Sequence, residues 1–382
     1  MSYELTEEQQ LIRETVRAFA LKEVAPLARL IDKNNEFPLE KVKKMAAINL
    51  MGIPFPEKYG GAGGDELSYI ITVEELARIC GSTAITLAAH ISLGSFPIYH
   101  FGTESQKEKY LKPLARGEKI GGLGITEPNA GSDVSGITTT AAKHPDGYLL
   151  NGAKTFITNA HVGEIFIVVA RTDKGATATN GLSTFIVEKG MPGFRAGKKE
   201  DKLGLRGSDT GELIFEDCLV PEENRLGQEG AGFKYIMKTL DGGRISIGAL
   251  ALGLAQGALD KCLVYVKERK QFGQPIGSFQ AIQNMLADMV TEITAARHLV
   301  YQAAGLMDRG EPFSKESAMA KLFASETAMR ATKNAIQIFG GYGYMTEYEV
   351  ERFYRDAKLC EIGEGTSEIQ RLVIAKQVLG KL

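Results

Sequence analysis

The segment EIGEGTSEIQR, residues 361–371, places the carboxylate of Glu364 between two glycines. A charged residue beside glycine is typical of an exposed turn, and the sequence raises the question of why a lone acid stands there. The segment LGITEPNAGSD, residues 123–133, combines turn formers, glycines and hydroxyl groups. Its N–H and O–H groups could bind a phosphate or the polar edge of a ring, and a plain polar loop is the alternative interpretation.

Three further segments have residue types suited to a flat, charged ligand. Phe156 and Thr158 stand two apart in KTFITNA, so in a strand they share one face, and a core position for Phe156 is the alternative. Arg269 follows a helical pattern, where it could pair with a pyrophosphate or only cap the helix. The run from Gly340 to Gly343 has three glycines in four positions, as a ligand-binding backbone or a helix-ending turn requires.

The charge balance argues against nucleic acid as a partner. The chain has 45 Lys and Arg against 47 Asp and Glu, for a formal net charge of −2, and no long block of one sign. Binding to a phosphate backbone needs a concentrated basic surface. Neither a G-x-G-x-x-G dinucleotide motif between a strand and a helix nor a P-loop is present.

The cysteines, histidines and apolar runs indicate a soluble protein of a reducing compartment. The four cysteines form no C-x-x-C pair, so we expect free thiols, and the five histidines lack metal-ligand spacing, so we expect no metal site. The N-terminus is acidic and has no targeting features, and the most apolar run, residues 245–255, is too short to cross a bilayer. A cytoplasmic protein without membrane insertion is therefore expected.

The spacing of apolar residues changes twice, which predicts three domains. Residues 1–119 have a helical pattern, residues 120–228 form short strand-like runs, and residues 229–382 are helical again, with a first long helix over about 242–270. No helices alternate with the strands, so we expect an antiparallel β-barrel or sandwich. The fold class is mainly α with a middle β domain and a C-terminal four-helix bundle. Clefts between such domains are favoured ligand sites.

Local signals within these domains give more specific expectations. Ser105 with Glu108 fits a capping box at the start of a helix. Asn151-Gly152 between two β-branched runs predicts the tight turn of a hairpin. Small residues recur at every fourth position from Ala249 to Gly257, which predicts a helix face in close contact with another helix.

These segments also resemble the motifs of one family, in the order in which that family has them. LGITEPNAGSD looks like the first signature of the acyl-CoA dehydrogenase family, and QIFGGYGYMTEYEVERFYRDAK followed by EGTSEIQR looks like the second. NGAKTFITNA, ERKQFG and DGGR match further family segments. The resemblance covers essentially all 382 residues and points to the short- and medium-chain, butyryl-CoA-dehydrogenase-like branch.

The resemblance implies the three-domain fold expected above, FAD as cofactor and a homotetramer built as a dimer of dimers. It implies dehydrogenation of an acyl-CoA to the trans-2-enoyl-CoA in carboxylic acid degradation, with electrons passed to an electron-transferring flavoprotein. Matching positions imply FAD contacts from Leu123, Ile125, Thr126, Gly131, Ser132, Phe156, Thr158, Thr366 and Glu368. They imply contacts to the FAD of a neighbouring subunit from Arg269, Phe272, Gln280, Gln337 and Gly341. Acyl-CoA contacts are implied for Ser132, Asp241, Arg244, Gly363 and Gly365.

By the same resemblance, Glu364 occupies the position of the catalytic base, which takes the α proton while the flavin takes the β hydride. Its backbone N–H matches a donor to the thioester oxygen. Burial would raise the pKa of Glu364 from about 4.3 toward neutrality. One branch of the family carries its base just before the arginine that Arg244 matches. Gly243 stands there in this chain, so Glu364 is the remaining candidate.

Gly363 departs from the family pattern, because most short- and medium-chain relatives have Tyr at this position. The missing phenol predicts room for a branched or cyclic acyl group as well as a short one. Two alternatives stay open on the sequence. The first is an acyl-CoA oxidase that uses O₂, although such chains are generally longer. The second is a non-catalytic protein of the same fold, which would be colourless.

Overall fold

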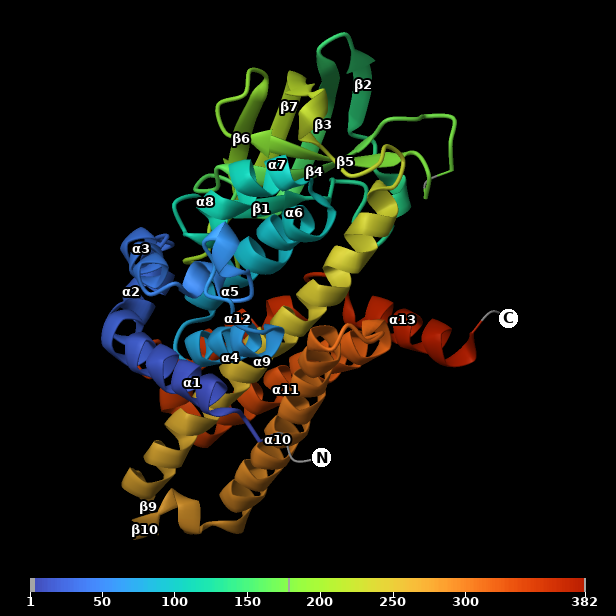
Figure 1. Cartoon of the computed structure of the whole chain (residues 1–382). Coiled ribbons are helices and arrows are strands. Elements are labelled where there is room, and N and C mark those ends of the chain that lie inside the picture. The colour runs from blue at the N-terminus through green and yellow to red at the C-terminus, as the bar shows by residue number, and fades with distance from the viewer. Residues whose placement is uncertain (1–3, 178, 381–382) are drawn as a thin grey trace.

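The computed structural model describes residues 4–177 and 179–380 and confirms the predicted order of helices, sheet and helices. The β-sheet lies at one end of the molecule, the N-terminal helices pack beneath it, and the long C-terminal helices form the other end (Figure 1). Helix α9, Gly232–Glu268, runs from the sheet past the N-terminal helices to the far end, so one helix contacts all three regions.

The N-terminal region is helical. Its helices are α1 Glu7–Phe19, α2 Ala25–Asn34, α3 Leu39–Ala47, α4 Glu66–Ala77, α5 Gly81–Ala88, α6 Phe96–Phe101, α7 Glu104–Gln106 and α8 Lys112–Ala115. The capping box of α7 is formed by Thr103 and Gln106, so the prediction of that box at Ser105 and Glu108 is wrong by two residues. Thr103 has the extended backbone that an N-cap needs, whereas Ser105 already lies within the helix.

The middle region is an eight-stranded sheet. Its strands are β1 Gly121–Gly124, β2 Thr140–His144, β3 Gly147–Thr158, β4 Ile165–Arg171, β5 Leu182–Glu188, β6 Phe194–Lys199, β7 Thr210–Pro221 and β8 Arg225–Leu226. The order is β6-β7-β3-β2-β4-β5-β8, and β1 pairs with β4. The β1–β4 pair and the short β2–β4 contact are parallel, so the sheet is not wholly antiparallel. Parallel pairing of β1 and β4 is possible because the β2–β3 hairpin separates them along the chain.

The Asn151-Gly152 dipeptide does not form a hairpin turn, which corrects the prediction made from it. Strand β3 continues through both residues, and the turn into β3 lies at Pro145 and Asp146. The register between β3 and β7 shifts at this dipeptide, and the Asn151 amide exchanges two hydrogen bonds with Asp217 of β7. A β-bulge uses the same backbone freedom of Asn and Gly as a tight turn, so the local signal does not distinguish the two.

The C-terminal region contains the longest helices. They are α9, α10 Gln280–Asp308, α11 Ser314–Phe339, α12 Val350–Cys360 and α13 Ser367–Leu379, with a short hairpin of β9 Lys270–Gln271 and β10 Gln274–Pro275 after α9. Helix α9 begins at Gly232, earlier than expected. The predicted close contact on its small-residue face is confirmed. A Cβ atom added at Gly253 would stand 2.3 Å from the Glu74 carbonyl oxygen, so α4 and α9 touch through their backbones.

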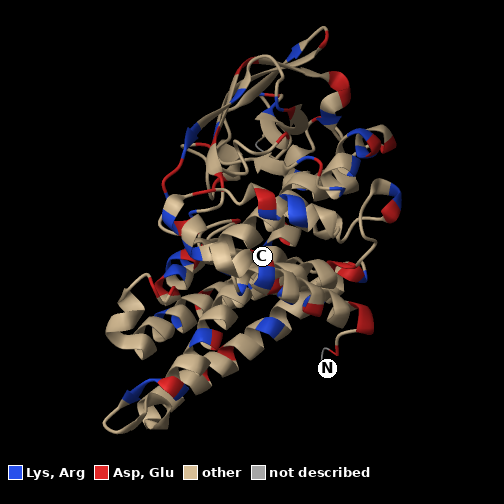
Figure 2. Cartoon of the chain, turned by 90° about the vertical axis from the view of Figure 1, so that its left-hand side faces the viewer, with Lys and Arg blue, Asp and Glu red and all other residues tan. Residues whose placement is uncertain are grey.

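Helix α9 is long and apolar enough to cross a membrane by length and composition alone, but 72% of its most apolar window is buried inside the protein. It therefore behaves as the core helix of the fold. The four cysteines are buried free thiols, as expected. Within residues 4–177 and 179–380, no group of three or more His, Cys, Asp or Glu side chains could hold a metal ion. On the side drawn in Figure 2, basic and acidic residues are interspersed along the helices (Figure 2).

Candidate active site

Glu364 lies in the short loop between α12 and α13 and has an unusual backbone conformation. Its φ is +54° and that of Gly365 is +95°, both in the left-handed region that residues with side chains rarely adopt. Thr366 is the N-cap of α13, where its hydroxyl accepts a hydrogen bond from the Ile369 N–H, and Glu368 is exposed in the first turn. Backbone strain of this kind persists only where the surroundings hold it, and it is concentrated at functional sites.

The Glu364 carboxylate packs against α9 at Gly243. A Cβ atom added at Gly243 would stand 1.9 Å from Glu364 Oε2 and 3.3 Å from Leu93 Cδ2. Any side chain at position 243 would therefore occupy the space that the carboxylate fills. The Oε2 atom is buried and has no hydrogen-bond partner. Gly243 thus makes room for the Glu364 carboxylate, whose Oε2 atom has no hydrogen-bond partner among the described residues.

Burial raises the pKa of Glu364 to about 7, and the nearby cations Lys321 and Arg244 limit the rise. Arg244 instead pairs with Asp241 on its own helix, and Lys321 Nζ donates to the Gly365 carbonyl oxygen at 2.7 Å. Neither cation bonds Glu364 Oε2. A carboxyl group with a pKa near 7 is partly ionised at neutral pH and still basic enough to take a proton, which is the balance that a general base needs.

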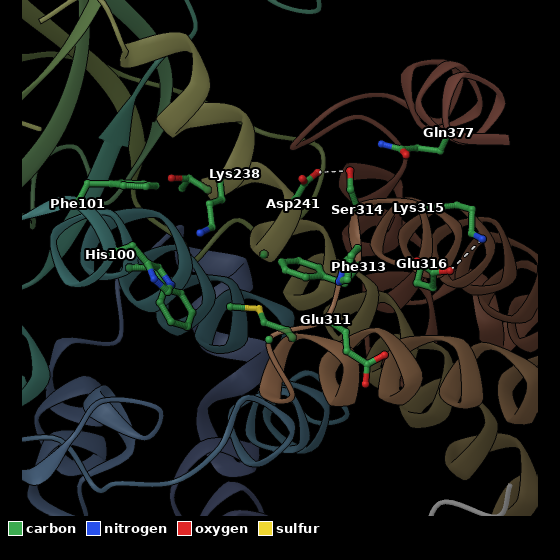
Figure 3. Close-up of a pocket in the computed structure, with 16 residues that line it drawn as sticks. His100, Phe101, Lys238, Asp241, Glu311, Phe313, Ser314, Lys315, Glu316 and Gln377 are labelled. Atoms are coloured by element: carbon green, nitrogen blue, oxygen red, sulfur yellow. Dashed lines mark hydrogen bonds and ion pairs between the residues drawn. The ribbon is translucent and has the colours of Figure 1, made fainter. Parts of the chain in front are cut away.

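A cavity of about 680 Å³ opens beside this part of α9. It lies between α6, the first turns of α9 and the loop that joins α10 to α11 (Figure 3). Asp241 and Gly242, the residues just before Gly243, form part of its wall, and Asp241 accepts a 3.0 Å hydrogen bond from Ser314 Oγ. Its wall also includes Phe96, His100, Phe101, Lys238, Phe313 and Lys315. Apolar walls with a few polar groups are typical of small-molecule sites.

The segment LGITEPNAGSD leads from β1 into a loop at the sheet. Leu123 and Ile125 are buried, Thr126 is half-buried, and Gly131 and Ser132 are exposed. Nothing lies within 4 Å of the place that a Cβ atom at Gly131 would take. The loop therefore presents small and polar groups to open space.

A buried ion pair that the sequence analysis missed holds this loop to β3. Lys154 Nζ donates to Glu127 Oε1 at 2.8 Å and to the Ile125 carbonyl oxygen at 3.0 Å, and Glu127 also accepts the backbone N–H groups of Thr138 and Thr139. Burial opposes ionisation, but Lys154 and these hydrogen bonds lower the pKa of Glu127 to about 2. No spacing rule connects positions 127 and 154. The only feature of the sequence that could have indicated this ion pair is the lysine at position 154 inside a predicted strand.

Replacing Glu127 by Gln is expected to destabilise the protein by about 3–5 kcal/mol, because it leaves the Lys154 ammonium buried without its counter-ion. The contribution of ionised Glu127 is present above the pKa of an unfolded Glu, about 4.3, and is lost as the pH falls toward the folded value. Thermal unfolding at pH 7 measures the change. The matched control is Glu216→Gln, which removes the exposed partner of the exposed Arg195 and should change the midpoint little. Equal losses in both variants would contradict the prediction.

Phe156 and Thr158 lie at the end of β3 on one side of the strand, since Ile157 between them is buried. Phe156 is 66% exposed, has a φ of +60° and stands where the register between β3 and β7 shifts. A large exposed ring on a strained backbone has no place in the core, so the core interpretation of Phe156 is excluded. Such a ring is available to cover a flat ligand.

The remaining predicted cofactor residues lie at the other end of the molecule. They are Arg269, Phe272, Gln280, Gln337 and Gly341. The β9–β10 hairpin, which carries Phe272, is at the opposite end from β3 (Figure 1). Phe272 is 92% exposed, and a groove of about 530 Å³ beside it includes Arg269 and Gly341. One chain therefore does not bring these residues together with Phe156.

The groups present at both ends fit an extended cofactor such as FAD. The exposed ring of Phe156 beside the Thr158 hydroxyl suits a flavin, and the open loop at Gly131 suits its polar edge. Gly340 and Gly341 also have nothing within 4 Å of an added Cβ atom, so their backbone is open to a ligand.

Family models and a curated relative cover almost the whole chain. The models of the N-terminal, middle and C-terminal domains of acyl-CoA dehydrogenase match residues 6–118, 122–218 and 230–379. The short-chain specific acyl-CoA dehydrogenase of Clostridium acetobutylicum is 54% identical, over 99% of this chain and 100% of its own length.

Solved structures agree with this match. The butyryl-CoA dehydrogenase of Megasphaera elsdenii has a TM-score of 0.97 and 50% identity, over 99% of this chain and 100% of the other. A chain from the structure of the electron transferring flavoprotein of Acidaminococcus fermentans has a TM-score of 0.98 and 52% identity, over 100% of both chains. The protein described here therefore belongs to the acyl-CoA dehydrogenase family of oxidoreductases.

Proposed function

We propose that the protein converts a short-chain acyl-CoA to the trans-2-enoyl-CoA with Glu364 as the base. The observation that carries this proposal is the Glu364 carboxylate: its Oε2 atom is buried against Gly243 without a hydrogen-bond partner in the part of the chain that the structure describes, and its pKa is about 7. The names of the short-chain and butyryl-CoA relatives support the substrate class.

In this reaction the Cα–H bond of the thioester breaks and its proton passes to a Glu364 oxygen. FAD, the cofactor of the family, would be held at Phe156, Thr158 and the loop at Gly131 and would supply the acceptor for the hydride that leaves Cβ. Negative charge develops on the thioester oxygen during proton removal. Within the described residues the Glu364 N–H has no acceptor, so it is free to donate to that oxygen. The same residue would then supply both the base and one oxyanion donor.

The predicted cofactor residues at the end of the molecule opposite the sheet support an assembly of several copies. Arg269 is half-buried in the wall of an open groove and Phe272 is exposed beside it, yet both lie far from Phe156 in the same chain. A homotetramer, with each FAD bound between two chains, would give these residues a ligand. Electron transfer to an electron-transferring flavoprotein is part of the same proposal.

Anaerobic titration of the yellow protein with a series of acyl-CoAs tests this function. We expect butyryl-CoA or another short, branched or cyclic acyl-CoA to bleach the flavin absorbance. A protein that no acyl-CoA bleaches would contradict the proposal, and a colourless protein would favour the non-catalytic alternative. Rapid reoxidation of the bleached enzyme in air with formation of peroxide would favour the oxidase.

Gly363→Tyr is expected to narrow the acyl specificity. The atoms nearest to a Cβ added at Gly363 belong to Leu359 and stand 3.5 Å away or more, so a side chain can begin here without a clash. The ratio of kcat/KM for a branched or cyclic acyl-CoA to that for butyryl-CoA should fall by about 10- to 100-fold, the usual effect of removing space for one or two carbons. Gly363→Ala is the matched control, with a smaller change. An unchanged ratio in the Tyr variant would show that Gly363 does not determine specificity.

A further inference from the structure

We propose that Lys321 is a positioning residue for Glu364, acting through the carbonyl group of the next residue in the loop. The inference rests on the proposed role of Glu364 as the base. It concerns a side chain on α11 that none of the sequence motifs includes.

Lys321 holds the strained turn in place. Its side chain is fully buried, and Nζ donates to the Gly365 carbonyl oxygen at 2.7 Å. Gln370 Nε2, from α13, donates to the same oxygen at 2.8 Å and to the Glu364 carbonyl oxygen at 3.3 Å. The carbonyl groups on both sides of the left-handed turn are therefore fixed by side chains of two different helices. Because the turn is strained, these hydrogen bonds direct the Glu364 side chain toward Gly243.

A lysine is a costly choice for this contact. Burial lowers the pKa of Lys321 to about 8, and among the described residues Nζ bonds the Gly365 carbonyl oxygen and forms no ion pair with a carboxylate. A neutral donor would satisfy the carbonyl group without the cost of burying a charge. The positive charge therefore has a second effect, which is to favour the ionised form of Glu364.

Other titratable groups also lie near Glu364 and could influence its ionisation. Arg244 on α9 also favours ionisation of Glu364, but Asp241 pairs with it. Directly after α12, Glu361 is paired with Lys358. Burial raises the pKa of the Cys360 thiol to about 12, so this neighbour of Lys321 is neutral. Lys321 is thus the cation near Glu364 without a paired acid.

The test compares Lys321→Met with wild type, both loaded with FAD, by measuring kcat/KM against pH with butyryl-CoA or with the acyl-CoA that bleaches the enzyme best. The wild-type acid limb should have a midpoint near pH 7, where Glu364 ionises. Removing the charge should move the midpoint of Lys321→Met upward by about one pH unit. Loss of the hydrogen bond to the Gly365 carbonyl oxygen should lower the plateau value of kcat by about 10-fold, because the base would then be misplaced relative to the substrate. Lys333→Met, at an exposed position of α11, is the control and should match wild type.

Two further variants separate positioning from a merely structural role. Lys321→Arg keeps the charge and should keep the midpoint of the acid limb near the wild-type value. Gln370→Leu removes a neutral donor to the same carbonyl oxygen, so kcat should fall without a shift of the midpoint. If Lys321→Met does not fold, the same comparison is made with Lys321→Gln. An acid limb that stays at the wild-type pH in the uncharged variant overturns the inference. Full activity of a Glu364→Gln enzyme would overturn the proposed function instead.

Discussion

Replacing Glu364 by Gln is expected to lower kcat for acyl-CoA oxidation by about 10⁴-fold, the upper end of what a positioned general base contributes. The amide has nearly the shape of the carboxyl group and fits the same space against Gly243, but it cannot accept the α proton. Binding of FAD and acyl-CoA should persist. Anaerobic stopped-flow bleaching measures the rate, and the spectral shift on adding acyl-CoA measures binding.

The control for this variant is Glu361→Gln, three residues earlier, where the acid pairs with Lys358 and should leave the rate near wild type. Stability gives a second check. The pKa of Glu364 is raised in the folded state, so its ionisation opposes folding as the pH rises above about 4.3. At pH 8 the Gln variant should therefore unfold at the same temperature as wild type or higher. Bleaching of Glu364→Gln at the wild-type rate would mean that the base lies elsewhere.

Gly243→Ala is expected to lower kcat by about 100-fold without loss of stability. The added methyl group would overlap Glu364 Oε2, and the carboxylate, as the free end of a side chain, would turn away from its site. A displacement of about 1 Å at a reacting group can cost about 100-fold in rate. Ala also has a higher helix propensity than Gly by about 1 kcal/mol, so α9 itself should not be weakened. Steady-state kinetics and thermal unfolding of the same preparation test both parts.

Gly242→Ala is the matched comparison, because it adds the same methyl group one residue earlier on α9. Its Cβ atom would meet Met307 at 3.7 Å, an ordinary contact, in the wall of the cavity. Gly242→Ala should therefore raise KM for the acyl-CoA and leave kcat nearly unchanged. Equal losses of kcat in the two variants would indicate a general disturbance of α9 and would contradict the specific role of Gly243.

The site could be predicted in part because motifs are local. The residues around Glu364 and the hydroxyls after β1 each form a short continuous segment, so they could be matched to family motifs that imply a base and a cofactor loop. The ion pair of Glu127 with Lys154 and the contact of Lys321 with Gly365 join residues far apart in sequence. No local pattern marks such partners, because burial and tertiary packing create them. Local patterns also mislead, since Asn151-Gly152 suits a bulge as well as a turn.

The sequence by itself determined the order of helices, sheet and helices, because apolar periodicity depends on neighbours in the chain. Its resemblance to one family also pointed to Glu364 as the candidate base. Only the tertiary structure showed why Glu364 and Gly243 belong together. The family resemblance implies that another branch carries its base at the position of Gly243, and here the Glu364 carboxylate fills the space that a side chain at 243 would take. A side chain at position 243 and the Glu364 carboxylate cannot occupy the same space. The glycine on α9 and the acid in the α12–α13 loop therefore form one site. The pKa of about 7 has the same origin, because burial between those elements removes water from the carboxylate.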